Sequence, residues 1–305
     1  MVLDAERQRR LDAVGFDYAR QPKVDAVCDL CGGERLATIA RTDRYGFDAR
    51  TVACLRCGNA FMSPRMTESA FGAFYASTYR PLVSAFHGRV IDAQSVEEDQ
   101  RPYAHALVEL LGPTLDNRKA LRVLDVGGST GVIAEALNDA FGARTTVIDP
   151  APDEVERARA RGLDAIVGTM EAFEAGSERF DLVTICQTID HLLEVGRSLE
   201  NIRSLLAEGG LVFVDIVDFR AAYLRAWSIE AATKIDHPHS LTEPTIEAYL
   251  ARAGLHPLLR DYAPDHLHVG YVCEATTPIK DALPSDDSVA TFFREIRYVQ
   301  NAPRP

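Results

Sequence analysis

One short stretch of the sequence, Leu121-Arg-Val-Leu-Asp-Val-Gly-Gly-Ser-Thr-Gly131, constrains the fold more than any other. It has the pattern of a buried apolar strand that ends in an acid, followed by a glycine-rich turn and the start of a helix. Gly127, Gly128 and Gly131 allow a ligand to approach the backbone without interference from Cβ atoms, and the first N–H groups of the helix are free to bind it. The stretch therefore predicts a nucleotide-type pocket at the edge of an α/β sheet.

The spacing of the glycines narrows the kind of nucleotide. A dinucleotide fingerprint starting at Gly127 would need glycine where the chain has Ser129 and Val132. A phosphate-binding P-loop would need a Gly-Lys-Ser/Thr ending, which this stretch lacks. The pattern that fits is acid-x-Gly-x-x-x-Gly, with Asp125 just before the turn.

Further strand-like runs follow at the intervals expected for an α/β sheet. Thr145–Asp149 is β-rich and ends in an acid 24 residues after Asp125, where a carboxylate suits the two hydroxyls of a ribose. The runs 164–167, 180–186 and 208–215 are predicted as three more strands, and 255–262 and 266–275 as a final pair. We predict a helix over 243–254, because it has Pro near its start and Gly at its end.

Four of the six cysteines form two Cys-x-x-Cys pairs separated by 22 residues. Each pair is followed by glycine, which permits a tight knuckle around a metal ion. This spacing is typical of a zinc ribbon with four thiolate ligands, and the alternative is a pair of disulfides or redox dithiols. Because four thiolates complete a tetrahedron, a zinc ion here is expected to be structural. The four candidate ligands are Cys28, Cys31, Cys54 and Cys57.

Length and composition limit the possible partners. The 305 residues are enough for about two domains, and the net charge of −12 with a pI near 5.2 argues against a nucleic-acid partner. No apolar run approaches the roughly 20 residues that would span a bilayer. Residues 1–20 are charged and lack the apolar centre of a signal peptide. A cytoplasmic protein without a membrane partner is expected.

The chain is expected to divide into four segments. Residues 1–66 hold a short helix and the cysteine ribbon, with strands at 51–54 and 60–62, and residues 67–111 form a helical connector or lid. The connector is expected to contain a helix over 67–79 and an amphipathic stretch over 83–111, broken near Ser95. Gly112-Pro113 marks the start of the nucleotide-binding core, 112–275, and a helical tail occupies 276–305. His-rich residues 234–242 are predicted as a loop.

The core motifs together resemble those of the class I S-adenosylmethionine (SAM)-dependent methyltransferases, with Ser129 where the usual motif has a third glycine. The acid-His pair Asp190-His191 after the fourth strand and the Gly-Gly before the fifth add to the resemblance. It implies a Rossmann-like, mostly parallel sheet with an antiparallel closing pair. It also implies that the cofactor contacts Asp125, Gly127, Gly128, Ser129, Gly131, Asp149, Pro150, Thr169, Met170, Gln187 and His191.

With the ribbon included, residues 24–275 resemble the zinc-containing bacterial sugar methyltransferases, which act on nucleotide-linked deoxysugars and belong partly to surface-glycan pathways. The resemblance rests on the ribbon, on Tyr79-Arg80 after it, and on Asp236-His-Pro-His239 before the 243–254 helix. Relatives that methylate carbon usually have Tyr-His-Glu-His in that loop, so here C-methylation and O-methylation both stay open. The resemblance implies a general base at His239 or His237, and substrate contacts from Tyr79, Arg80 and Asp236.

The sequence thus predicts a methyltransferase that acts on a sugar, in particular a nucleotide-linked sugar or a saccharide of a glycan or natural product. Two alternatives stay open: methylation of RNA or another non-sugar acceptor, and a non-catalytic SAM-fold binding protein. If His239 is the base, His239→Ala should keep cofactor affinity and lose most turnover.

Overall fold

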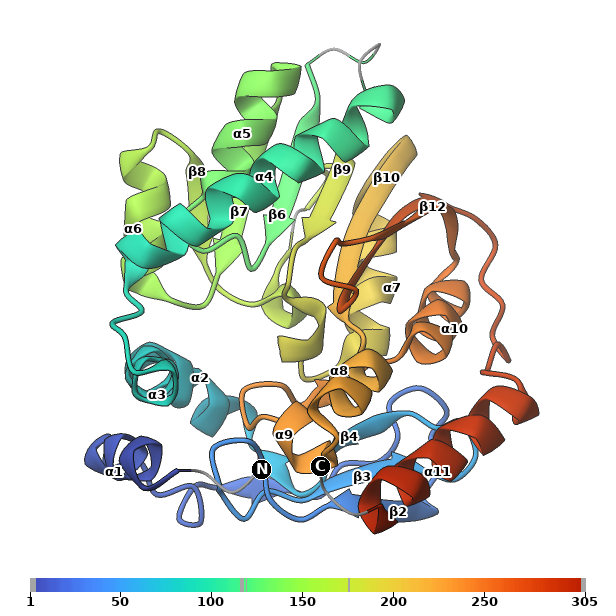
Figure 1. The fold of residues 1–305 in the computed structure, drawn as a ribbon. Coiled ribbons are helices and arrows are strands. Elements are labelled where there is room, and N and C mark those ends of the chain that lie inside the picture. Colours follow the sequence, from blue (N-terminus) through green and yellow to red (C-terminus); the bar gives the residue numbers. More distant parts are fainter. Residues whose placement is uncertain (1–3, 116–117, 119, 175, 303–305) are drawn as a thin grey trace.

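The structure of the chain is a computed structural model that describes residues 4–115, 118, 120–174 and 176–302. At its centre lies a seven-stranded sheet of order β12-β13-β10-β9-β6-β7-β8 (Figure 1). The five strands from β10 to β8 are parallel, and β13 and β12 close the sheet as an antiparallel pair. This confirms the predicted Rossmann-like α/β class. The strands span β6 (Arg122–Val126), β7 (Arg144–Asp149), β8 (Asp164–Val167), β9 (Phe180–Ile185), β10 (Leu206–Val217), β12 (Leu255–Tyr262) and β13 (His268–Ala275).

Helices cover both faces of this sheet, and strand β10 shows why. Its side chains alternate between two cores: Leu211 and Phe213 pack in one, Val212 and Val214 in the other. The first core is closed by α4 (Ala93–Leu115) and α5 (Val132–Phe141). Helix α6 (Pro152–Ala160) packs beside α5 in a smaller cluster. The second is closed by α7 (Val195–Leu205) and α10 (Glu243–Ala253). A sheet buried on both faces in this way fixes the carboxyl ends of its parallel strands as a rigid edge.

The cysteine-bearing segment forms a second, four-stranded antiparallel sheet of order β11-β4-β3-β2. Strands β2 (Leu36–Ala40), β3 (Thr51–Cys54) and β4 (Ala60–Met62) come from the N-terminal part, which confirms the predicted strands 51–54 and 60–62. The fourth strand, β11 (His239–Ser240), comes from the segment predicted as a loop. That prediction was wrong at these two residues, because pairing with β4 supplies backbone partners that only the folded chain brings together.

A third group of elements lies below the edge of the central sheet (Figure 1). Helices α1 (Ala5–Ala13), α2 (Glu68–Ser77) and α3 (Tyr79–His87) share an aromatic core, and β1 (Lys23–Val24) pairs with β5 (Arg65–Met66). Helix α2 confirms the helix predicted over 67–79. The remaining elements are η1 (Met170–Ala172), η2 (Ile189–His191), α8 (Phe219–Ala226), α9 (Ile229–Ala232) and α11 (Asp286–Asn301), which packs on the small sheet through Phe292 and Ile296.

The expected boundary at Gly112-Pro113 falls inside α4, which continues to Leu115. Leu107, Leu111 and Leu115 recur every four residues and are buried against the central sheet, so apolar packing keeps the helix intact through the proline. The break expected near Ser95 lies earlier, where α3 ends at a left-handed glycine, Gly88.

Candidate active site

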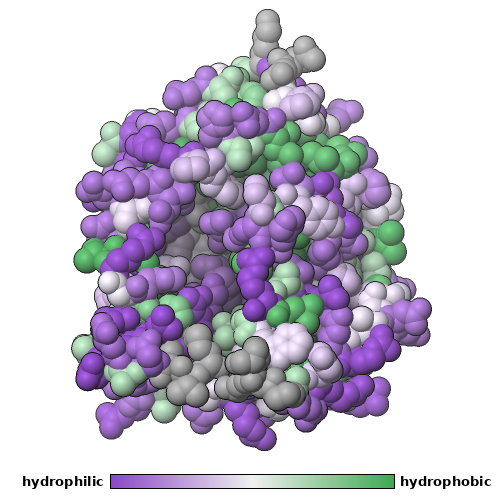
Figure 2. All heavy atoms as spheres, in the orientation of Figure 1, coloured by the Kyte–Doolittle hydropathy of each residue, from purple (hydrophilic) through white to green (hydrophobic). Residues whose placement is uncertain are grey.

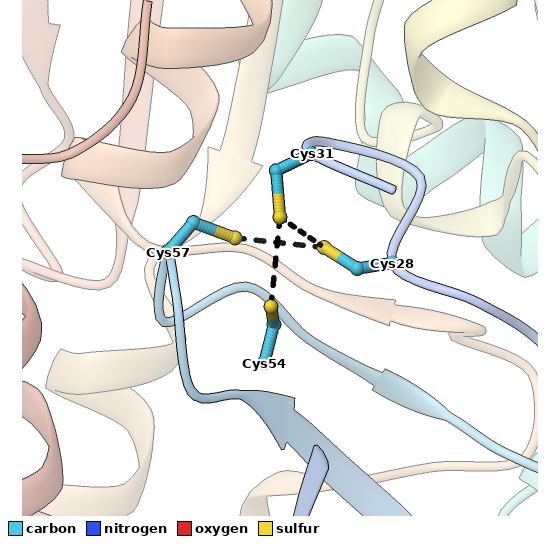
Figure 3. Close-up of side chains that lie close together, drawn as sticks. All are labelled: Cys28, Cys31, Cys54 and Cys57. Carbon is cyan, nitrogen blue, oxygen red and sulfur yellow. Dashed lines mark hydrogen bonds between the residues drawn. The ribbon is translucent and has the colours of Figure 1, made fainter. Parts of the chain in front are cut away.

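The four paired cysteines converge on one point in the N-terminal part of the chain (Figure 3). The sulfur of Cys28 lies 3.5 Å from that of Cys57 and 3.6 Å from that of Cys31. The sulfurs of Cys31 and Cys54 are 3.5 Å apart. These separations are far too long for disulfides. They are close to the roughly 3.8 Å between sulfurs that bind one tetrahedral zinc ion at about 2.3 Å. The cluster therefore has the ligand types and the geometry for a metal ion.

The cluster is part of the main core rather than an appendage. Cys28, Cys54 and Cys57 are buried among residues of α7 and α10. Asn59 donates a hydrogen bond from Nδ2 to the hydroxyl of Tyr249 on α10, at 3.0 Å. The cysteine-bearing segment is thus positioned against the same helices that cover the central sheet.

The glycine-rich turn after β6 is packed so tightly that side chains are excluded. A Cβ atom at Gly127 would overlap the side chain of Thr188, and one at Gly128 would overlap the carboxylate of Asp125. Gly127 also has a φ of 71°, which glycine adopts without strain. The backbone of the turn can therefore lie directly against a ligand.

Asp125 lies beneath this turn and not in the wall of the cavity. It is fully buried, and its Oδ1 accepts a 2.7 Å hydrogen bond from the hydroxyl of Thr184. Burial raises the pKa of Asp125 to about 6, and its Oδ2 has no partner among the described residues. A buried acceptor without a partner is costly, so a donor from a bound group or water would relieve it.

Asp149 lies at the end of β7, as predicted, beside the turn. Its carboxylate accepts hydrogen bonds from the backbone N–H of Ser129 at 2.9 Å and of Ala151 at 2.8 Å. Burial, together with the nearby Glu154, raises the pKa of Asp149 to about 7 in spite of these two donors. Near neutral pH the carboxyl is thus poised between its charged and neutral forms.

The turn, Asp149 and the N-terminal helices enclose one cavity of about 770 Å³, and Figure 2 shows this face of the molecule hollowed there. The cavity is lined by ten of the predicted site residues: Gly127, Ser129, Asp149, Pro150, Thr169, Met170, Gln187, His191, Tyr79 and Arg80. Six others do not line it: Asp125, Gly128, Gly131, Asp236, His237 and His239. The structure thus brings eight of the eleven predicted cofactor residues to one cavity but separates two of the three candidate histidines from it.

The part of the cavity away from the turn is walled by β5, α2 and the N-terminal half of α4. Phe71, Tyr75 and Tyr103 bring aromatic surface to it, and Arg65 brings a guanidinium. Arg65 makes no ion pair within 4 Å among the described residues; its Nη1 donates to the carbonyl of Leu193 and lies 3.4 Å from Nε2 of His239. The sequence did not predict these residues as part of the site, because neither an aromatic helix face nor a lone arginine indicates which cavity it will line.

His191, on η2, is the one histidine in the cavity wall among the described residues. Burial, with the neighbouring His237, lowers the pKa of His191 to about 4, so the ring is neutral at pH 7. Its Nδ1 is hydrogen-bonded to the hydroxyl of Tyr75, and this hydroxyl lies 3.1 Å from the backbone carbonyl of Asp236. Tyr75, which the sequence did not predict as a site residue, therefore holds the imidazole of His191 in place.

His237 lies behind His191, with 4.3 Å between the two ring centroids, and both of its nitrogens have partners. Its Nδ1 contacts the carboxylate of Asp190, and its Nε2 lies 2.8 Å from the Nζ of Lys234. Asp190, His191 and His237 are close enough to share a metal ion. However, a lysine that donates to Nε2 leaves the ring proton on Nδ1, where it bonds Asp190 and excludes a metal. This buried group is better described as a hydrogen-bonded support for His191.

His239, on β11, is 1% exposed, pairs with Phe61 of β4, and does not line the cavity. Its Nε2 lies 3.2 Å from the carbonyl oxygen of Leu193 and 3.4 Å from Nη1 of Arg65. The histidine therefore contacts two residues of the cavity wall without reaching the cavity itself.

Comparison with known proteins decides the family. Residues 96–259, more than half of the chain, match the family described as "Methyltransferase domain". The chain belongs to this family. It is a SAM-dependent methyltransferase, and the predicted enzyme class is confirmed.

This methyltransferase is similar to curated proteins named "Ubiquinone biosynthesis O-methyltransferase". The one from Methylocella silvestris is 36% identical over 101 residues, which are 31% of this chain and 39% of that protein. The one from Xanthomonas oryzae pv. oryzae is 29% identical over 161 residues, 50% of this chain and 65% of that protein. The chain thus spans only about two fifths to two thirds of the length of these relatives.

Two solved structures share the fold. A chain from the Haloferax volcanii complex of the Trm112 methyltransferase activator has a TM-score of 0.51 and 15% identity, covering 68% of this methyltransferase and 98% of that chain. DesVI from Streptomyces venezuelae has a TM-score of 0.50 and 19% identity, and the match covers 61% of this methyltransferase and 99% of DesVI. In addition, within the part of the chain that the structure describes, we find no helix long and apolar enough to cross a bilayer.

Proposed function

We propose that this methyltransferase transfers a methyl group to a hydroxyl of a small acceptor that also carries an anionic group, and that a nucleotide-linked sugar is its acceptor class. The observation that carries the proposal is a single cavity that joins the glycine-rich turn and Asp149 to a chamber containing a neutral histidine and an arginine without a carboxylate partner. The first half suits the cofactor and the second suits the acceptor.

In this proposal the cofactor lies against the turn at 127–131. The residues present fit it: Gly127 lines the cavity with backbone that carries no side chain, and Asp149 is an acceptor for ribose hydroxyls. Gln100, on the opposite wall, has a buried Oε1 without a partner among the described residues, which a cofactor donor group would satisfy. The bound cofactor supplies an electrophilic methyl group on a sulfonium, and the protein orients the acceptor toward it.

His191 is the general base of the proposal. It lines the cavity and is neutral at pH 7, so it can accept a proton from an acceptor hydroxyl. If Tyr75 donates its one proton to the carbonyl of Asp236, its oxygen accepts the Nδ1 proton of His191. That arrangement leaves a lone pair on Nε2. The carboxylate of Asp190, 3.8 Å from Nε2, would stabilise the imidazolium that forms.

Arg65 supports an anionic group on the acceptor. Its guanidinium is partly buried at the cavity, and burial lowers its pKa although the carboxylates of Asp29, Glu194 and Glu171 act in the opposite direction. A phosphate or carboxylate would pair with the N–H groups that Leu193 leaves free. His239 would then act by holding Arg65 and the Leu193 carbonyl in place rather than as a base.

The cysteine cluster is proposed to hold a structural zinc ion. Its four sulfurs complete a tetrahedron, so no coordination position remains for water or substrate. Cys28 and Cys54 belong to the core that α7 and α10 share with the central sheet, so the ion would fix the wall of the acceptor chamber from behind.

A phenolic ring is the second candidate acceptor. It is favoured by the names of the curated relatives and by the aromatic wall of Phe71, Tyr75 and Tyr103. A phenol without an anionic group would give Arg65 no partner, so the arginine distinguishes the two candidates.

The test is a screen of nucleotide-linked sugars, free sugars and catechols with isotopically labelled SAM, followed by NMR of the product. For an anionic acceptor, Arg65→Met should raise KM roughly tenfold to a hundredfold with little change in kcat, because a charge-assisted contact to the ground state is lost. Arg197→Met is the matched control, since Arg197 is exposed at the cavity rim and already pairs with Glu194 at 3.3 Å. Turnover of catechols alone, equal in both variants, would contradict the proposed acceptor.

Cofactor affinity is predicted to depend on pH through Asp149. Its carboxylate form accepts the ribose hydroxyls, whereas a carboxyl with a pKa of about 7 is mostly protonated below that pH. SAM should therefore bind more weakly as pH falls below 7, by up to about tenfold per unit, and at constant affinity well above 7. Isothermal titration between pH 5.5 and 8.5 measures this, and Asp149→Asn should bind weakly at every pH. A wild-type affinity that rises toward low pH would contradict the assignment.

A further inference from the structure

Ser129 occupies a backbone conformation that serine seldom adopts. Its φ is 51°, in the left-handed region, at the position where the methyltransferase motif usually has glycine. Glycine would adopt this conformation without strain, so a serine here needs a compensating contact. Its backbone N–H bonds Asp149, and its hydroxyl donates to the carboxylate of Glu154 on the first turn of α6. The compensating contact is thus made to a charged group, where a hydrogen bond is strongest.

Glu154 also accepts from Arg80, which lies on α3 in the N-terminal part of the chain. The Nε of Arg80 is 3.0 Å from Oε1 of Glu154, and Nη2 contacts the same oxygen. Only 12% of the Glu154 side chain and 29% of the Arg80 side chain are exposed, so solvent screens the pair weakly. The guanidinium that the sequence assigned to a substrate phosphate is therefore already bonded to a protein carboxylate.

Three segments far apart in the sequence are joined by these contacts. Ser129 belongs to the cofactor turn, Glu154 to α6, and Arg80 to α3, next to Tyr79 in the acceptor half; all of them line the same cavity. Glu154 and Asp149 are two neighbouring acids, and Arg80 is a cation that offsets part of their negative charge. Loss of Arg80 would leave two carboxylates close together without compensation.

We propose that Ser129, Glu154 and Arg80 form a clasp that couples the cofactor turn to helix α3, so that binding of the cofactor orders the acceptor side of the cavity. A cofactor that holds the turn at 127–131 fixes the Ser129 hydroxyl. Ser129 then holds Glu154, and Glu154 holds Arg80 and the start of α3. Ser129 and Glu154 act as positioning residues, and the clasp makes binding of cofactor and acceptor cooperative. The inference does not depend on which acceptor the enzyme uses.

Hydrogen–deuterium exchange of the full chain, with and without saturating S-adenosylhomocysteine, tests the clasp. In the wild type the ligand should slow exchange of amides both in the turn and in residues 79–87, by roughly tenfold or more. In Glu154→Gln and Ser129→Ala the turn should stay protected while the protection of 79–87 is lost. Ser129→Gly separates strain from coupling: it relieves the left-handed residue but removes the hydroxyl, so 79–87 should again lose protection.

Arg144→Met is the matched control. Arg144 forms an exposed ion pair with Asp164, with 2.7 Å between nitrogen and oxygen, and neither residue lines the cavity. This variant should retain protection of both segments. Equal protection of 79–87 in the wild type and all clasp variants would overturn the proposal, as would a wild type in which the ligand protects only the turn. Arg80→Met should still bind the ligand; complete loss of binding would identify Arg80 as a direct cofactor ligand and also overturn the clasp. Because no acceptor is added, these outcomes are independent of the proposed acceptor class.

Discussion

His191→Asn should lower turnover by about 10² to 10⁴, the range for loss of a general base, while SAM affinity changes little. Asparagine has a similar size and can still donate from its amide to the oxygen of Tyr75, so the cavity wall should persist. The residual neutral amide cannot take a proton from the acceptor. Steady-state kinetics with the acceptor found in the screen, combined with SAM titration, measure the two effects separately.

His239→Ala is the companion variant, because the sequence by itself favoured that residue as the base. From its position we expect a higher acceptor KM through displacement of Arg65, with a smaller loss of kcat. If His239→Ala loses turnover by more than a hundredfold and His191→Asn does not, the base is His239 and our assignment is wrong.

If the cysteine cluster holds the proposed zinc ion, Cys54→Ser should release it and unfold the small sheet. Structural zinc sites contribute about 10 kcal/mol or more to folding, and a serine hydroxyl is a poor replacement for a thiolate. Cys54 is fully buried at the end of β3, and the sheet also includes β11, so the loss should reach Arg65 and the acceptor chamber. Metal analysis should show that the zinc content falls from one ion per chain to much less. Turnover of the acceptor should fall as well.

SAM affinity should survive this substitution better than turnover, because the turn at 127–131 and Asp149 belong to the central sheet. Cys273→Ala is the control: Cys273 is equally buried but lies on β13 outside the cluster, so zinc content should not change. A Cys54→Ser protein with full zinc content and normal melting would refute the four-thiolate site.

The cofactor half of the site was largely predictable from sequence because its geometry is local. A strand, a turn and a helix follow one another from 122 to 141, and the spacing of their glycines fixes where the backbone is free of side chains. The acid at the end of the next strand must lie beside the first, since adjacent parallel strands end at the same edge. The cysteine cluster was predictable for the same reason, since each Cys-x-x-Cys pair is one short turn.

The acceptor half was not predictable because it is assembled from residues that are distant along the chain. Tyr75 is hydrogen-bonded to His191, which is 116 positions away in the sequence, and Arg80 to Glu154, which is 74 positions away. Nothing in the spacing of these residues distinguishes them from surface tyrosines, arginines and glutamates. His237 and His239 show the opposite case. Their sequence pattern resembles a catalytic loop, but the segment packs behind the cavity, because β11 pairs with β4.

The sequence by itself determined the fold class, the enzyme family, the glycine-rich turn with Asp149 beside it, and the four cysteines that cluster. These follow from periodicity and short-range spacing, which are encoded residue by residue. Only the tertiary structure decided which histidine lines the cavity, that Arg80 is already paired, and that Arg65 lacks a carboxylate partner. Those properties depend on burial and on contacts between separate segments, and both exist only once the chain has packed.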